Sequence, residues 1–158
     1  IDVVYPVHPN PNVQNVAKII LSGHDRIHLI KPLDYVSFID AMDNAYLILT
    51  DSGGIQEEAI SLGKPTLVLR DTTERKEAII SGIVKLVGTE RNKIIKEAQK
   101  LLDNFDEYSK IKKVDNPYGN GDAAEKIVSL MEKLWFIERR EDLLRNVHNI
   151  ILQKNNGE

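Results

Sequence analysis

Short apolar runs alternate with segments of helical spacing along the first part of the chain. The runs are rich in Val, Ile, Leu and Thr, and four of the five begin shortly after polar or turn-forming residues. We expect strands at residues 2–5, 27–30, 46–50, 66–69 and 83–87. Helical spacing predicts helices between them, with apolar faces that include Val13, Val16, Ile19 and Ile20, then Val36, Ile39 and Ala41, then Ile55, Ala59 and Leu62.

This alternation of strand and helix predicts the fold class. It is typical of a doubly wound α/β fold, in which a parallel sheet is covered by helices on both faces. Ligands of such folds bind beyond the carboxyl ends of the strands. Residues 51–54 follow one predicted strand end and residues 70–75 follow the next, so these two turns are the first places to look for chemistry.

The last part of the chain changes character. Apolar residues from Ile94 to Leu102 recur at helical spacing and predict a helix. The sequence NPYGNG at residues 116–121 has the composition of a loop. Beyond it, apolar residues from Ile127 to Ile151 predict one long helix or two helices joined near residues 138–142. The polar tail at 153–158 is expected to fray.

Composition narrows the function without fixing it. The 158 residues suit one globular domain, and a net charge of -3 gives no general attraction to nucleic acid. The absence of cysteine excludes disulfides and thiolate sites, and the four histidines lack a ligand spacing, so we expect no metal. No apolar run approaches the ~20 residues that span a bilayer, and the first residues do not resemble a signal peptide. We therefore expect a cytoplasmic protein without a membrane partner.

The turn at residues 51–54, Asp-Ser-Gly-Gly, is a candidate anion site. Ser52 can cap the following helix, and Gly53 and Gly54 allow backbone N–H groups to approach a diphosphate. Glu58 lies one helical turn further on the same face, where its carboxylate could accept hydrogen bonds from ribose hydroxyls. The alternative is a simple strand-to-helix turn followed by solvated glutamates, and the turn alone does not decide between the two.

The turn at residues 70–75, RDTTER, adds two guanidinium groups at a second strand end. Arginine suits phosphate oxygens because its planar group donates two parallel hydrogen bonds. The alternative is a capped helix, with Thr72 or Thr73 as the cap and Arg75 paired to a nearby acid. Because the two turns are expected at one edge of the sheet, the combination favours a ligand site.

Six segments together resemble the non-hydrolysing UDP-N-acetylglucosamine 2-epimerases. They are PVHPNPNV at 6–13, PLDY at 32–35, DSGGIQEEA at 51–59, GKPTLVLRDTTER at 63–75, KLVGT at 85–89 and NPYGNGDAAEKIV at 116–128. The resemblance covers residues 1–131 and implies the UDP-binding second domain, Rossmann-like, of a GT-B type fold. Residues 132–158 lie outside it as a C-terminal helical extension.

The resemblance also implies roles for individual residues. Ser52, Gly53 and Gly54 would hold the diphosphate of UDP, Glu58 the ribose, and Arg75 a further part of the nucleotide. The uridine would lie near Leu33 and Phe38, with backbone contact at Leu33 because some members have glutamine there, and His8 would lie near the nucleotide-sugar pocket. From sequence alone, Phe38 also suits a core position, and His8 suits a strand end.

The family reaction is the conversion of UDP-N-acetylglucosamine to UDP-N-acetylmannosamine, through elimination and re-addition of UDP. The resemblance implies no cofactor. It places the acid and base carboxylates in a preceding domain, so the catalytic residues are expected outside this sequence. The first strand of the second domain has no counterpart either. Because that strand is central in the order 3-2-1-4-5, we expect a gap in the sheet, as in a fragment, a split-enzyme half or a remnant.

Two other interpretations remain open at this stage. The chain could be a binding module for UDP or a UDP-sugar, with Trp135, Phe136 and Ile137 forming an interaction surface rather than packing on the domain. It could also belong to a GT-B glycosyltransferase, although the DTTER and NPYG segments favour the epimerase. The expected partners are UDP-N-acetylglucosamine or UDP, and a separate N-terminal half or a homodimer partner.

Overall fold

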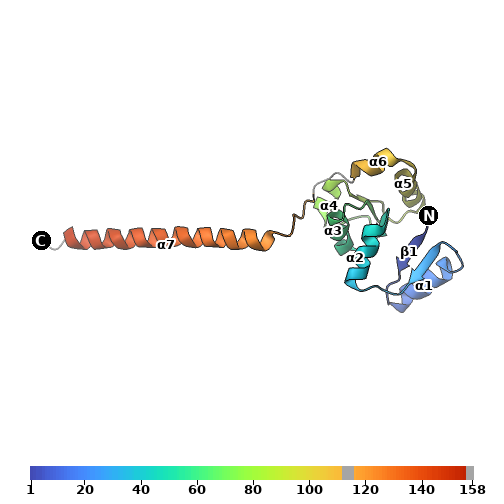
Figure 1. The fold of residues 1–158 in the computed structure, drawn as a ribbon, viewed down its shortest axis with the longest axis horizontal. Coiled ribbons are helices and arrows are strands. Elements are labelled where there is room, and N and C mark those ends of the chain that lie inside the picture. Colours follow the sequence, from blue (N-terminus) through green and yellow to red (C-terminus); the bar gives the residue numbers. More distant parts are fainter. Residues whose placement is uncertain (112–115, 156–158) are drawn as a thin grey trace. The chain divides into compact units, whose positions relative to one another are not determined.

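The computed structural model describes residues 1–111 and 116–155, with side chains to residue 149. The chain divides into two compact units, Ile1–Pro117 and Tyr118–Glu158. Figure 1 traces the elements from β1 in blue to α7 in red. The expected boundary at residues 131/132 between a UDP-binding domain and a helical extension stays a prediction.

The first unit alternates strand and helix, as the hydrophobic pattern predicts. Its elements are β1 (Val3–Pro6), α1 (Pro11–Leu21), β2 (Ile27–Ile30), α2 (Tyr35–Asn44), β3 (Ile48–Thr50), α3 (Gly53–Ser61), β4 (Thr66–Val68), α4 (Lys76–Ser81), β5 (Val84–Leu86), α5 (Arg91–Asp103) and α6 (Phe105–Ile111). Helix α6 was not expected from the apolar spacing. It follows Asn104, whose side chain accepts hydrogen bonds from the N–H groups of Asp106 and Glu107.

Polar side chains fix where several of the helices begin. Asn10 accepts a hydrogen bond from the N–H of Asn12, and Asp34 accepts one from the N–H of Ser37. Glu90 accepts two at the start of α5. Each bond satisfies a donor that the helix itself leaves unpaired, so the local sequence determines the end of the preceding loop.

The strands form two parallel sheets, one with β1 and β2 and one with the order β3-β4-β5. Among the described residues no ladder joins β1 to β3, so the predicted gap is confirmed. The N–H of Val3 bonds to Arg26 and that of Ile48 to Pro65, which places both residues on the paired sides of their strands. Because neighbouring residues in a parallel strand face opposite sides, the backbone groups of Val4 and Leu49 face the open edges.

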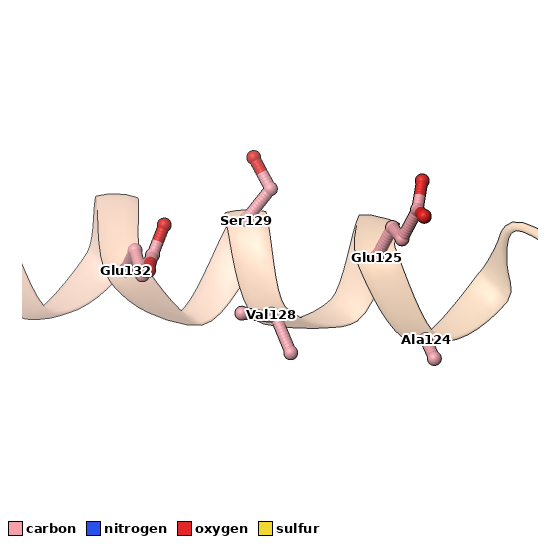
Figure 2. A pocket seen from close by; sticks show the side chains of 5 residues that line it. All are labelled: Ala124, Glu125, Val128, Ser129 and Glu132. Atoms are coloured by element: carbon pink, nitrogen blue, oxygen red, sulfur yellow. The ribbon is translucent and has the colours of Figure 1, made fainter.

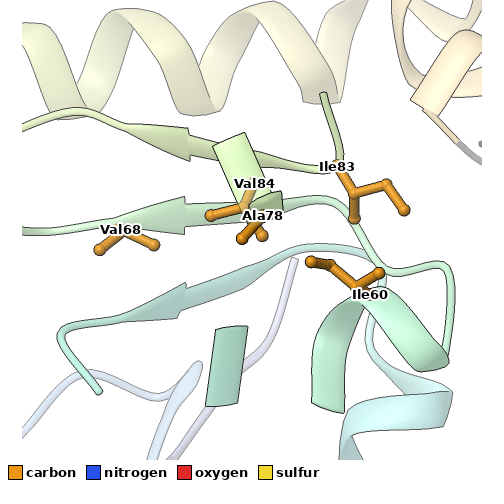
Figure 3. Close-up of a cluster of buried hydrophobic side chains, with 5 residues drawn as sticks. All are labelled: Ile60, Val68, Ala78, Ile83 and Val84. Carbon is orange, nitrogen blue, oxygen red and sulfur yellow. The ribbon is translucent and has the colours of Figure 1, made fainter. Parts of the chain in front are cut away.

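The core lies around the β3-β4-β5 sheet. One cluster joins α3, β4, α4 and β5, and Figure 3 shows its buried side chains gathered between these elements: Ile60, Val68, Ala78, Ile83 and Val84. A second cluster contains Met42, Ile48 and Ala59, with Phe38 packed against it. The β1–α1–β2 segment contributes to none of the described clusters. It exposes Val4 and Ile19 among other apolar side chains, so it is held less firmly than the rest of the unit.

The second unit is built on one helix, α7 (Ala123–Asn155), which follows the predicted loop. The helix is unbroken across residues 138–142 and reaches into the tail that was expected to fray; residues 156–158 lie outside the described part. A single helix has no core of its own. Figure 2 shows the side chains that line a shallow hollow, all of them on α7, from Ala124 to Glu132. Among the described helices, none is long and apolar enough to cross a membrane.

Candidate nucleotide-binding site

The two candidate turns meet at one edge of the three-stranded sheet. The turn at 51–54 follows β3 and leads into α3, while the turn at 70–75 follows β4 and leads into α4. Since β3 and β4 are parallel neighbours, their carboxyl ends lie side by side. The sequence prediction that these turns come together is therefore confirmed.

Gln56 links the two turns through its buried side chain. Its Nε2 donates a hydrogen bond to the carbonyl of Ser52 at 3.1 Å, and its Oε1 accepts one from the Thr73 hydroxyl at 2.9 Å. The same Thr73 oxygen accepts a hydrogen bond from the N–H of Arg75 at 3.1 Å. Gln56 has 0% exposure, so its amide can be satisfied only by these protein groups. The network fixes the start of α3 relative to the second turn.

The end of β5 joins the same edge. The N–H of Gly88 donates a hydrogen bond to the carbonyl of Arg70 at 3.1 Å. Gly88 has a φ of 67°, and a Cβ atom there would lie 2.8 Å from Oδ1 of Asp71. Glycine therefore suits both the backbone conformation and the close approach of Asp71. The KLVGT segment thus supports the turn that carries the arginines.

Ser52 stands at the N-cap of α3, but its side chain makes no capping hydrogen bond, contrary to the sequence prediction. Its N–H instead donates to the Thr50 hydroxyl at 3.1 Å, and its carbonyl is held by Gln56. These contacts close the turn without the serine hydroxyl. The positive end of α3 is therefore left without a side-chain cap at Ser52, and a Cβ atom at Gly54 would meet open space.

Carboxylates surround the arginines of the second turn. Arg75 forms an ion pair with Glu57 through Nε and lies 3.6 Å from Oε1 of Glu74 through Nη1. Arg70 Nη1 lies 3.6 Å from Oε2 of Glu74. The prediction that Arg75 pairs with an acid is confirmed, whereas capping of α4 by Thr72 or Thr73 is wrong, because α4 begins after Arg75 without a side-chain cap.

The carboxyl group of Glu74 has a lowered pKa and lies against the start of α3. A hydrogen bond from its own backbone N–H is the main cause of the lower pKa, and the charges of Arg70 and Arg75 add to it. A Cβ atom at Gly53 would lie 2.5 Å from Glu74 Oε1. The Glu74 carboxylate therefore lies between the two arginines and beside the first residue of α3.

The other predicted residues are placed as follows. Glu58 lies on α3, and within the described part of the chain its carboxylate makes no hydrogen bond or ion pair. His8 is exposed just beyond β1, where Nδ1 accepts a hydrogen bond from the N–H of Asn10 at 3.1 Å. Leu33 is half-buried in the loop after β2. Phe38 packs into the cluster under α2 and α3, as its alternative core role requires.

Comparison with known proteins adds a family to this geometry. The family model described as UDP-N-acetylglucosamine 2-epimerase matches residues 1–132. This chain belongs to that family. A UDP-N-acetylglucosamine 2-epimerase of Campylobacter jejuni is 58% identical over 133 residues, which are 84% of this chain and 35% of that protein. The chain thus spans about a third of the length of the curated relatives it matches.

Solved epimerase structures agree with the fold. The enzyme of Neisseria meningitidis, solved bound to UDP-GlcNAc, is 48% identical with a TM-score of 0.79, over 84% of this chain and 36% of that one. The Methanocaldococcus jannaschii enzyme, in complex with UDP-GlcNAc and UDP, is 35% identical with a TM-score of 0.68, over 84% and 36%. The Rossmann-like, GT-B type assignment is therefore confirmed. The individual roles of the site residues stay predictions.

Within this epimerase-family site, sequence reasoning missed the hydrogen bond between Gln56 and Thr73 and the position of Glu74 between the two arginines. Gln56 lies inside the quoted DSGGIQEEA motif, and its only signal was a polar residue on the face that packs inward with Ala59 and Ile60. The contact between Gln56 and Thr73 joins segments that no helical or strand spacing relates. It became visible only when both turns were placed on the sheet.

Proposed function

We propose that this chain forms the UDP-binding part of a UDP-N-acetylglucosamine 2-epimerase. The observation that supports this most directly is the joining of the 51–54 and 70–75 turns through Gln56 and Thr73. It brings a helix start and an arginine pair to one edge of the sheet, which is the combination that a diphosphate requires. The relative from Neisseria meningitidis, bound to UDP-GlcNAc, supports the same ligand class.

The proposed reaction breaks the bond between C1 of the sugar and the diphosphate oxygen after a proton leaves C2. UDP departs with both electrons of that bond and later adds back, after C2 regains a proton on the opposite face. Residues 52–54 and Arg75 would stabilise the charge that develops on the departing diphosphate. Glu58 would accept hydrogen bonds from the ribose, Leu33 and Phe38 would lie by the uridine, and His8 would lie near the sugar. The acid and base groups belong to the remainder of a full-length protein.

The open sheet edges support a partner as part of this proposal. The side chains of Val4 and Leu49, whose backbone groups face those edges, are 56% and 49% exposed. One parallel strand between β1 and β3 would pair with both edges and join the two sheets. We propose that this strand comes from the remainder of the epimerase, either in the same polypeptide or in a separate half. We also propose that the full-length protein is cytoplasmic and that a second copy of it can act as a homodimer partner.

Calorimetric titration of UDP into the chain tests the proposal. We expect saturable binding that is lost or weakened at least tenfold in Glu58→Ala and Arg75→Ala, because each removes a charged contact to the nucleotide. Glu132→Ala and Arg91→Ala, which remove exposed charges of α7 and α5, are the matched controls and should bind as the parent chain does. A folded chain that does not bind UDP would contradict the proposal.

A further inference from the structure

Glu74 lies between two guanidinium groups and beside the first residue of α3. Its two carboxylate oxygens each face a different guanidinium group, with Oε2 3.6 Å from Arg70 Nη1 and Oε1 3.6 Å from Arg75 Nη1. Oε1 also covers Gly53, the first residue of α3, closely enough that a Cβ atom there would be 2.5 Å away. A side-chain carboxylate therefore lies beside the first residue of a helix and between two arginines.

These are the groups that a phosphate would use at the same place. Ser52 does not cap α3 through its side chain, so N–H groups at the start of the helix remain available to an anion. Arg70 and Arg75 offer the donors that suit phosphate oxygens. A phosphate that contacts Gly53 and both arginines would overlap the carboxylate of Glu74, and two anions cannot share those donors.

We propose that Glu74 acts as an internal anion, which occupies the diphosphate position in the free chain and is displaced when a nucleoside diphosphate binds. This inference rests on the proposed function. Glu74 is exposed enough to turn toward solvent, and Arg75 keeps its ion pair with Glu57 when Glu74 leaves. The site therefore remains assembled in both states.

Displacement makes the site selective for ligand charge. The incoming group has to replace the interactions of Glu74 with two guanidinium groups before it contributes any of its own. A diphosphate can contact both arginines and the start of α3 together, whereas a neutral nucleoside cannot compete for any of them. Glu74 thus lowers the affinity for every anion at this position and excludes weakly charged ligands most strongly.

The test is calorimetric titration of UDP into the parent chain and into Glu74→Gln. The amide keeps the size of the side chain but removes its charge, so we expect UDP to bind about fivefold or more tightly to the variant. Glu77→Gln, which neutralises an exposed glutamate in the first turn of α4, is the matched control and should leave the affinity unchanged. Inorganic pyrophosphate serves as a second probe that needs no nucleoside contacts.

The outcomes separate this inference from the proposed function. If UDP binds the parent chain and Glu74→Gln binds it equally or more weakly, the inference is overturned and the proposed function stands. If UDP binds neither chain but pyrophosphate binds Glu74→Gln more tightly than the parent, Glu74 is an internal anion in a site that is not a UDP site. If neither probe binds either folded chain, both ideas are overturned.

Discussion

At the residue scale, Gln56 determines how the candidate site is assembled. Its buried amide joins the start of α3 to the turn after β4, and it uses both its donor and its acceptor. A glycine-rich turn and an arginine-rich turn could each form without it. Their relative position could not be fixed in the same way, because the ion pair between Glu57 of α3 and Arg75 of the second turn joins partly exposed side chains.

Replacement of Gln56 by leucine should therefore destabilise the chain. The variant leaves the Thr73 hydroxyl and the Ser52 carbonyl without their partner, which costs about 1–3 kcal/mol for groups of this kind. Urea denaturation measures the change in the free energy of unfolding. Gln99→Leu, at an exposed position of α5, is the matched control and should change it by less than about 0.5 kcal/mol. Equal changes in the two variants would contradict the structural role of Gln56.

The same residue shows what the sequence could and could not predict about the site. Ser52, Gly53 and Gly54 are visible because glycine and serine at a strand-to-helix junction have a direct physical meaning. Gln56 and Thr73 are ordinary polar residues in their local sequence. They gain their role from a contact between two elements, and hydrophobic periodicity contains no information about such a contact.

At the scale of elements, the β1–α1–β2 segment differs from the β3-β4-β5 sheet. The β1–β2 pair contributes to none of the described hydrophobic clusters, and a two-stranded pair of this kind has low local stability. Strand β4, in contrast, pairs on both sides and buries Leu67 and Val68 almost completely. The order of the strands thus predicts a difference in local stability within one unit.

Amide hydrogen exchange should reveal this difference. We expect the amides of Tyr5 and His28, which face into the β1–β2 ladder, to exchange at least tenfold faster than those of Leu67 and Val68 in β4, because local opening of the pair exposes little apolar surface. Exchange followed by NMR at one pH measures both groups in one sample. Equal protection in the two sheets would show that β1–β2 is packed more firmly than its contacts indicate.

The element pattern was largely predictable, and its misses have physical reasons. The five strands and helices α1, α2, α3 and α5 follow from short β-branched runs and helical spacing, whereas α4 was considered only as an alternative interpretation of the 70–75 turn. Helix α6 was not predicted because its 7 residues are too few to show an apolar stripe at helical spacing. Its start depends on the cap that Asn104 provides. The sequence predicts either one helix or two over the residues of α7, because a charged run at 138–142 interrupts the apolar pattern without any helix-breaking residue.

At the scale of the whole molecule, the proposed binding edge belongs to a chain that spans about a third of the length of its curated relatives. The matched region accounts for 35% of the Campylobacter jejuni epimerase, and under the proposal a further strand would pair with the two open strand edges. The sequence could predict the gap between β1 and β3 because the order of strands in a doubly wound sheet is constrained. The apolar residues of α7 specify no partner by themselves.

The central claim is that the turns at 51–54 and 70–75 form one site for the diphosphate of UDP. NMR chemical-shift mapping of the ¹⁵N-labelled chain during UDP titration tests it most directly. We expect the amides of Gly53, Gly54, Thr73 and Arg75 to shift together with one dissociation constant, while amides of α5 and α7 do not move. Shifts confined to one turn, or found only elsewhere in the chain, would contradict it.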